Sequence, residues 1–296
     1  MSDLGAGTDT GRDNELSLKR SAKVARIGDQ VRSGRMSDFN VVQITDCHLG
    51  SEPNERLLGL NTDLSLHDVL AQIQRNETPD LLLVTGDISN DGGPISYARF
   101  LTIADRYFPN TPLAWLPGNH DDPDNMLVAG KHPIEHRFRS EHWHMIFLNS
   151  RIPGEEGGHL GEDELRRLER ELDAHKDIPT ALFLHHQPVP VGSSWVDQYV
   201  LDDADAFFAI TDKYPQVTLI SWGHIHQEFH AERNGVTLMA TPSTCVQFVP
   251  KSDEFRLDDK MPGYRSYQFS EDGQYCSHVG RIDEKSYPVN MAATGY

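Results

Sequence analysis

The stretch VVQITDCHLG, residues 41–50, joins an apolar run to three consecutive side chains that can bind metal ions. Residues 39–45 read as a buried strand, and Asp46, Cys47 and His48 follow it directly. Side chains two positions apart on an extended segment point the same way, and the side chain between them points away. We therefore expect Asp46 and His48 to converge on one site, and Cys47 to face the core as a small buried hydrophobe.

The pattern of an apolar run followed by polar residues recurs along the chain. Further runs rich in Val, Ile and Leu read as buried strands at residues 80–86, 112–118, 144–150, 180–186 and 217–223. Amphipathic stretches with helical spacing lie between them, at residues 65–76, 94–108, 161–176 and 202–214. The C-terminal part reads as strands and hairpins at residues 235–243 and 264–282. This order of elements predicts an α/β sandwich with mixed sheets.

Metal-type ligands follow five of these six runs. The five groups are Asp46-Cys47-His48, Gly86-Asp87, Gly118-Asn119-His120-Asp121, His185-His186 and Gly223-His224-Ile225-His226. In open α/β sheets, ligands bind at the carboxyl ends of the strands, so these groups should meet. Glycine precedes three of the groups, where it permits the sharp turn that aims the next side chain into a cleft.

The types of ligand indicate the kind of metal. No second cysteine stands at ligand spacing from Cys47, which argues against a closed thiolate zinc site. A mixed set of oxygen and imidazole ligands suits two five- or six-coordinate ions such as Mn²⁺, Fe²⁺ or Zn²⁺, with positions open for water and substrate. A single DxH, GNHD or GHIH can be a purely structural turn. Their joint occurrence at successive strand ends predicts a dinuclear centre.

The composition narrows the class of partner. With 27 Lys and Arg against 45 Asp and Glu, the formal net charge is −18, which disfavours nucleic acids and anionic membranes as partners. No run of apolar residues is long enough to span a membrane. Residues 1–36 are polar and lack the apolar segment of a secretory signal, so we expect a flexible N-terminal extension. Three widely spaced cysteines indicate reduced thiols and a cytoplasmic protein.

The motifs DxH, GD, GNHD, HHxP and GHxH, in this order, resemble those of the calcineurin-like metallophosphoesterase superfamily. Longer stretches, GLNTDLSLHDVL, LPGNHDD, LHHQPVPVGSSWVDQ, GHIHQE and ATPSTCVQF, resemble the class III cyclic nucleotide phosphodiesterases of bacteria. The resemblance begins at about residue 39 and leaves the N-terminal extension unaccounted for. It implies one metallophosphoesterase domain over residues 37–296, built as a four-layer α-β-β-α sandwich with mixed sheets.

The resemblance also implies a set of metal ligands. Asp46, His48 and His226 would hold the first ion, Asn119, His185 and His224 the second, and Asp87 would bridge them. The HHxP motif offers His186 as a rival to His185. The family often shows GDxxD, whose last Asp orients the histidine of GNH. Here that position is Asn90 and the next is Asp91, and either residue could orient His120.

The implied reaction is hydrolysis of 3′,5′-cyclic AMP to 5′-AMP. A hydroxide between the two ions would attack phosphorus, and His120 would protonate the leaving oxygen, so His120 and the bridging Asp87 are the expected catalytic residues. The residues expected around the substrate are His48, Asp87, Asn119, His120, His224 and His226. Trp195 and Phe248 are candidates for contact with the base, or for ordinary packing. The alternatives are a phosphodiesterase or phosphatase of broader specificity and a non-catalytic scaffold.

Overall fold

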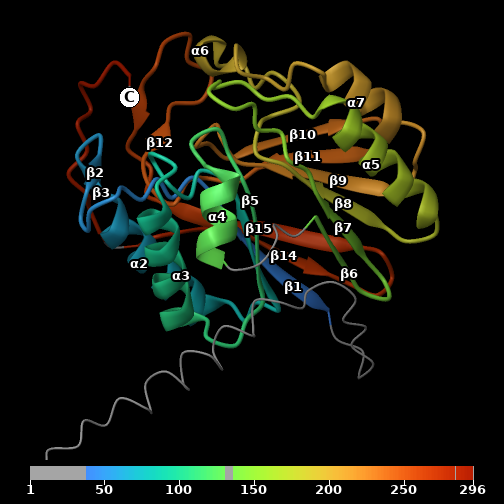
Figure 1. Ribbon diagram of the computed structural model, residues 1–296, viewed down its shortest axis with the longest axis horizontal. Helices are drawn as coiled ribbons and strands as arrows, with labels where there is room; N and C mark the ends of the chain where they lie inside the picture. Colours follow the sequence, from blue (N-terminus) through green and yellow to red (C-terminus); the bar gives the residue numbers. More distant parts are fainter. Residues whose placement is uncertain (1–37, 131–135, 284, 296) are drawn as a thin grey trace, which may run out of the picture.

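Two mixed β-sheets lie face to face at the centre of the protein (Figure 1). The computed structural model describes residues 38–130, 136–283 and 285–295, so the expected extension at residues 1–36 lies outside the described residues. In spatial order, the first sheet contains β15 (Tyr275–Arg281), β14 (Gly263–Phe269), β1 (Phe39–Ile44), β4 (Leu81–Thr85) and β5 (Leu113–Leu116). The second contains β10 (Phe229–Arg233), β11 (Val236–Ala240), β9 (Val217–Trp222), β8 (Thr180–Phe183), β7 (His144–Phe147) and β6 (Arg137–Arg139).

Parallel pairing fixes where the strand ends meet. β1, β4 and β5 are parallel neighbours in the first sheet, and β7, β8, β9 and β11 are parallel neighbours in the second. The remaining pairs, at the outer strands of each sheet, are antiparallel. The carboxyl ends of β1, β4 and β5 therefore lie along one edge of their sheet, as do those of β8 and β9 in theirs.

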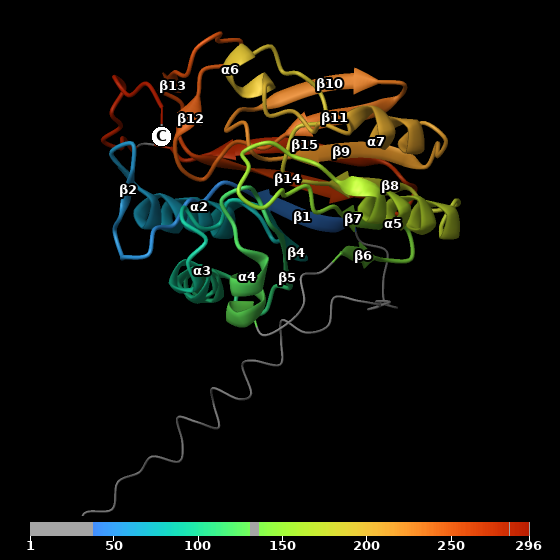
Figure 2. The same ribbon diagram turned by 45° about the horizontal axis from the view of Figure 1, so that its top comes forward.

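Helices cover the outer face of each sheet. α2 (Thr62–Asn76), α3 (Pro94–Tyr107) and α4 (Pro123–Gly130) lie against the first sheet, and α5 (Gly161–Ala174) and α7 (Ala204–Thr211) against the second (Figures 1 and 2). Local signals agree with these starts: Asn61 caps α2 by accepting a hydrogen bond from the Leu64 N–H, and Pro94 begins α3. Within the described residues, no helix combines the length and the hydrophobicity that a membrane crossing requires.

Three buried clusters show the layering. One joins β1 and β4 to α2 and α3 through Ile44, Val84 and Phe100, and another joins β8 and β9 to α5 and α7 through Leu182 and Phe207. The third lies between the sheets and includes Leu83, Phe147 and Phe183. The predicted four-layer α-β-β-α sandwich is confirmed.

Smaller elements surround the edge where the parallel strands end. Two short hairpin pairs, β2 (Arg56–Leu57) with β3 (Leu60–Asn61) and β12 (Gln247–Phe248) with β13 (Leu257–Asp258), lie there together with α6 (Ser194–Asp197). The sequence pattern did not predict these elements, and two of them, α6 and β12, contribute side chains to the cavity described below.

Candidate metal centre

Every residue group predicted at a strand end comes together at one site. Asp46 and His48 follow β1, Asp87 follows β4, and the loop after β5 brings Asn119 and His120. The histidines after β8 and β9 complete the site, which includes His185, His186, His224 and His226. Within this set, ligand atoms form four overlapping clusters of three, each within 4.8 Å. All of these residues are buried except Asn119 and His120, which are half-buried.

The backbone brings the ligands together by a different geometry from the one expected. Asp46 and His48 converge, but not from an extended segment, because their φ angles are +54° and +46°. Asp87, His224 and His226 also have positive φ, between +48° and +62°. Asp and His tolerate this left-handed region better than branched residues, and such strain commonly gathers at functional sites. Cys47 lies fully buried in the core, as predicted.

The three glycines have two different roles. Gly86 has a φ of +95°, so it makes the sharp turn that the sequence predicted. Gly118 and Gly223 do not have positive φ, and instead they allow close approach. A Cβ on Gly118 would lie 2.2 Å from Asp87 Oδ1, and a Cβ on Gly223 would lie 2.0 Å from Thr45 Oγ1. These two positions are therefore glycine because the loops after β1, β4, β5 and β9 pack directly on one another.

The first group of ligands lies around Asp46. The Nε2 atoms of His48 and His226 are 3.2 Å apart, and Asp46 Oδ1 lies 3.4 Å from His226 Nε2. The other nitrogen of His226, Nδ1, lies 2.8 Å from the carbonyl oxygen of Val246. A carbonyl can only accept, so Nδ1 carries the proton and the lone pair of Nε2 can bind an ion.

Asp87 lies between the first and second groups. Its Oδ2 atom is 3.7 Å from His48 Nε2 and 3.3 Å from His185 Nε2, and its Oδ1 atom accepts a hydrogen bond of 2.9 Å from the His120 N–H. Burial opposes charge on this carboxyl, but His185 and His120 outweigh burial and hold the pKa of Asp87 well below its usual value. Asp87 is thus an ionised carboxylate with one oxygen facing histidines from both groups.

The second group consists of Asn119, His185 and His224. Asn119 Oδ1 lies 3.1 Å from His185 Nε2 and 3.0 Å from His224 Nδ1. His185 Nδ1 lies 2.7 Å from the Thr85 carbonyl oxygen, so it donates there and Nε2 stays free. Asn119 Oδ1 and His185 Nε2 therefore each have a lone pair that can bind a cation, and His224 Nδ1 has one when its ring carries the proton on Nε2.

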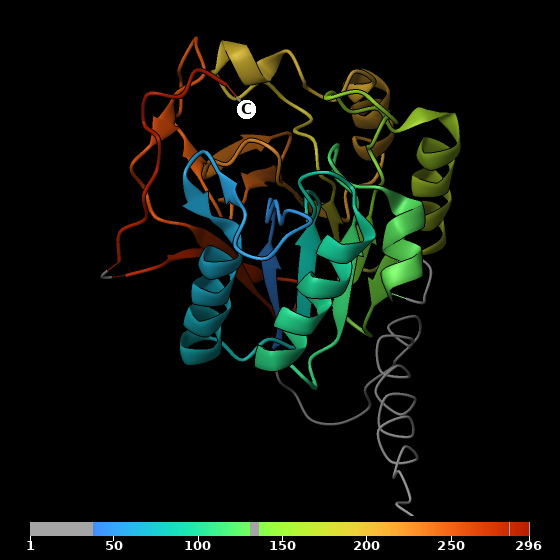
Figure 3. The ribbon, with the colours of Figure 1, turned by 60° about the vertical axis from the view of Figure 1, so that its left-hand side comes forward.

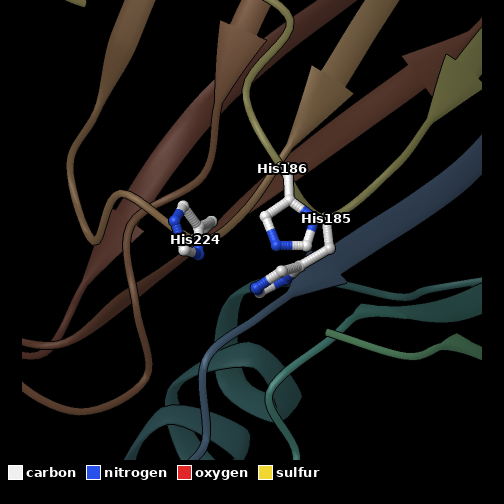
Figure 4. Close-up of side chains that lie close together, drawn as sticks. All are labelled: His185, His186 and His224. Atoms are coloured by element: carbon white, nitrogen blue, oxygen red, sulfur yellow. The ribbon is translucent and has the colours of Figure 1, made fainter. Parts of the chain in front are cut away.

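His186 lies beside this group but is held differently (Figure 4). Its ring centre is 4.9 Å from that of His185 and 4.8 Å from that of His224, while its Nδ1 atom lies 2.8 Å from Ser150 Oγ. His185, in contrast, contacts Asp87 and Asn119 through its Nε2 atom. Of the two histidines, His185 is the one aimed at both the second group and the bridging carboxylate.

The donor set fits two cations. Asp46 Oδ1 is buried without a hydrogen bond among the described residues, and paired imidazole nitrogens face each other at 3.2 Å. Burial alone would lower the pKa of His185, but Asp87 outweighs it and raises that pKa to about 9; Asp46 likewise raises the pKa of His226 to about 10. The two buried carboxylates therefore attract positive charge strongly, and oxygen and imidazole ligands suit divalent transition metals.

His120 lies beside the ligands at the edge of a cavity. Its Nδ1 atom is 3.0 Å from the carbonyl oxygen of Asn90, so the backbone of Asn90, and not its side chain, orients the ring. The Asp91 carboxylate instead accepts hydrogen bonds from Ser51, Ser89 and the Gly93 N–H. The cavity is about 460 Å³, and Asn119, His120 and His224 form part of its lining.

Asp121 is a site residue to which the sequence analysis gave no role. Its buried carboxylate accepts hydrogen bonds from the N–H groups of Ile88, Ser89 and Gly118, and from the Tyr97 hydroxyl. It therefore ties the loop after β4 to the loop after β5. The Asp directly after GNH was a usable signal, because a carboxylate in a buried glycine turn is placed to accept backbone N–H groups.

This fold and site define a dimetal phosphoesterase, and the chain belongs to the calcineurin-like phosphoesterase family, whose model matches residues 39–228. The fold implies a dinuclear metal centre. The chain is 39% identical over 259 residues to the 3′,5′-cyclic adenosine monophosphate phosphodiesterase CpdA of Pseudomonas aeruginosa, covering 86% of this chain and 94% of the relative. It is 38% identical to the protein of the same name from Escherichia coli (strain K12), with 86% and 94% covered.

Solved structures share the fold at low identity. A dimetal phosphatase from Danio rerio aligns with a TM-score of 0.52 and 13% identity, over 83% of this chain and 100% of the other. A purple acid phosphatase from yellow lupin aligns with a TM-score of 0.60 and 13% identity, over 86% of this chain and 54% of the other. These likenesses support the fold alone.

Proposed function

We propose that this protein hydrolyses 3′,5′-cyclic AMP to 5′-AMP at a centre of two divalent metal ions. The observation that carries the proposal is the position of Asp87, whose Oδ2 atom lies within 3.7 Å of histidines from both ligand groups. The substrate assignment rests on relatives named as phosphodiesterases of this cyclic nucleotide, which the chain matches over most of its length.

The proposed ligands follow from the contacts. Asp46, His48 and His226 would hold one ion, and Asn119, His185 and His224 the other, with Asp87 between them. Fe²⁺ and Mn²⁺ suit this mixture of oxygen and imidazole ligands, and Zn²⁺ is a further candidate. When bound, such ions lower the pKa of a coordinated water toward neutrality and neutralise charge on the phosphoryl oxygens.

His120 has the geometry of a general acid. Its Nδ1 proton is directed to the Asn90 carbonyl oxygen, and this contact orients the ring. The imidazolium form then carries a second proton on Nε2. Because His120 lines the cavity, that proton can pass to the departing 3′ oxygen of the substrate. The resulting hydroxyl leaves phosphate attached to the 5′ oxygen, which is 5′-AMP.

The other residues of the centre position the metal ions and the general acid relative to each other. The Asp87 Oδ1 atom fixes the backbone of His120, so the acid and the bridging carboxylate share one hydrogen bond. His48, Asn119, His224 and His226 would face the phosphate from the ligand side. Free cysteines and a net charge of −18 support a cytoplasmic enzyme whose partner is a small molecule, without nucleic acid or membrane.

Phosphorus NMR tests the proposal directly. Metal-stripped protein, reloaded with Mn²⁺ or Fe²⁺, should convert 3′,5′-cyclic AMP to 5′-AMP, and His120→Ala should slow the reaction by about 100-fold or more. His230→Ala, at an exposed histidine outside the centre, serves as the matched control. If the protein hydrolyses a generic aryl phosphodiester but leaves cyclic AMP intact, the assignment of cyclic AMP as the substrate is overturned. Two bound ions without turnover of either compound would make the protein a scaffold.

A further inference from the structure

The cavity beside His120 extends beyond the side chains that face the proposed metal centre. Its volume of about 460 Å³ lies within the usual range for small-ligand sites, roughly 300–1,000 Å³. Asn119, His120 and His224 account for the part of its lining that faces the proposed metal centre. The rest of the lining comes from the loop at residues 154–156, from α6 and the residues after it, from β12 and the loop that follows it, and from the C-terminal end of the described chain.

Aromatic side chains form a fixed corner of this second part. The Trp195 ring packs edge-to-face against Phe248 and Phe255, with ring centres 5.0 and 5.1 Å apart. Phe248 in turn stacks on His226, with ring centres 4.3 Å apart and planes 16° from parallel. All three aromatic rings line the cavity. The stacking thus holds the aromatic surface at a fixed position relative to His226, a proposed metal ligand.

The backbone that carries Trp195 is itself anchored. The two carboxylate oxygens of Asp197 accept hydrogen bonds from the N–H groups of Val191 and Gly192, at 2.7 and 2.9 Å. Ser194, next to Trp195, donates to Asp253 Oδ1 at 2.7 Å. The indole therefore has little freedom to move away from the cavity when a ligand enters.

Hydrogen-bonding groups lie next to the aromatic corner. Glu155, Glu156, Gln198 and Tyr199 all line the cavity. The hydrogen bond and charge of Glu156 raise the pKa of the Tyr199 hydroxyl to about 12, so these two side chains form a pair. Carboxylates only accept hydrogen bonds, which suits a ligand that presents N–H groups on a planar edge.

The last residues of the described chain close the same cavity. We call residues 285–295 the C-terminal strap; Thr294 and Gly295 line the cavity beside Trp195 and His120. The strap runs along the β2–β3 hairpin, where the Asn290 N–H donates to the Leu58 carbonyl at 2.7 Å (Figures 1 and 3). Farther back, the Tyr287 hydroxyl donates to Asp68 Oδ2 at 2.7 Å. The strap is therefore anchored before it reaches the cavity.

We infer that this part of the cavity is a nucleobase subsite, with Trp195 and Phe255 as its aromatic surface and the C-terminal strap as its closing wall. The inference rests on the proposed function. A cyclic 3′,5′-nucleotide is rigid at its fused phosphate and ribose rings, so a phosphate at the metal centre leaves the base to project into the remaining space. Stacking on an aromatic surface and hydrogen bonds to its edge would then bind the base.

The test compares two substrates that differ only in the base. One is 3′,5′-cyclic AMP, and the other is the 3′,5′-cyclic phosphate of 1-deoxyribose, whose sugar C1 carries no base. In metal-loaded full-length protein, Trp195→Ala should raise KM for cyclic AMP about 10-fold or more, within the range that loss of base stacking causes. Its KM for the base-free substrate and its kcat for both should stay within about 3-fold of wild type. Trp195→Phe should restore most of the affinity for cyclic AMP.

A second variant tests the strap without relying on Trp195. Deletion of residues 292–296 keeps the anchors at Tyr287 and Asn290, and should raise KM for cyclic AMP while leaving KM for the base-free substrate unchanged. The melting temperature checks that each variant is folded. Equal losses on both substrates, or an unchanged KM for cyclic AMP, would overturn the subsite while the proposed function stands. Wild-type protein that leaves cyclic AMP intact but cleaves the base-free substrate would overturn both.

Discussion

The Nε2 atoms of His48 and His226 lie 3.2 Å apart in a buried site, where one ring can donate to the other only as its Nε2–H tautomer and the two can instead present lone pairs to one cation. The two rings come from opposite sheets, since His48 follows β1 and His226 follows β9. Each nitrogen is directed by its own loop into the same small volume next to Asp46. A shared cation explains this arrangement with no unfavourable contact.

Removal of either ring should therefore remove one ion and leave the other. We expect His226→Ala to lower the bound metal from about two ions to about one per chain, because two of the three ligands of the second group, Asn119 and His185, are on other loops. Elemental analysis of the protein after gel filtration measures the stoichiometry, with His230→Ala as the control. Retention of both ions in His226→Ala would contradict the ligand assignment.

Gly118 should not tolerate a methyl group. Its Cβ would lie 2.2 Å from Asp87 Oδ1 and 2.6 Å from the Asp87 backbone nitrogen, so Gly118→Ala must displace the bridging carboxylate. We expect a loss of activity of about 100-fold or more, since small displacements of catalytic groups have effects of this size. The matched control is Gly157→Ala, where a new Cβ would meet nothing within 4 Å. Equal activity in the two variants would show that the loops adjust freely.

Asp121 should contribute more to the stability of the fold than to catalysis. Asp121→Asn would turn an acceptor-only group into one that presents an amide N–H₂ to the surrounding N–H donors of Gly118, Ile88 and Ser89. We expect the free energy of unfolding to fall by about 3 kcal/mol, the cost of leaving buried polar groups unsatisfied. Urea unfolding measures it, with Asp124→Asn on α4 as the control. A change under about 0.5 kcal/mol would rule out this function for the carboxylate.

His144 should make the protein less stable in acid. It is fully buried on β7, away from the metal centre, and burial lowers its pKa to about 3, with added effects of nearby cationic groups. The charged or titratable groups around it are Arg137, Arg139, Arg167, Glu171 and His175. Between pH 3 and 6.5 the unfolded chain binds more protons at this residue than the native protein does, so stability falls as the pH is lowered.

The comparison of two variants isolates this effect. From about pH 7.5 to about pH 5.5, His144 should account for a loss of about 1.4 kcal/mol in the free energy of unfolding. Urea unfolding of His144→Phe should show a pH dependence smaller by about this amount. His230→Phe, at an exposed position, should keep the wild-type pH dependence. An identical pH dependence in His144→Phe and wild type would contradict the prediction.

The hydrophobic periodicity and the residues at the strand ends were sufficient to predict the architecture. The runs at 80–86 and 180–186 became β4 and β8, and the turn at Asp272-Gly273 joins β14 to β15. Strands buried on both faces carry continuous apolar runs, so their ends can be predicted from the sequence alone. The elements that the pattern missed, such as α6 and the β2–β3 hairpin, are too short to have a period.

The sequence by itself determined which residues gather, because parallel strands end at the same edge and five of the six predicted strands ended in metal-type ligands. Only the tertiary structure decided how they meet. It placed His185 in contact with Asp87 of the opposite sheet, put His120 Nδ1 3.0 Å from a backbone carbonyl, and brought the C-terminal strap beside Trp195. These relationships join residues that are about 30 to 100 positions apart. No local pattern encodes them, since they depend on which side chains remain within a few ångströms after the layers have packed.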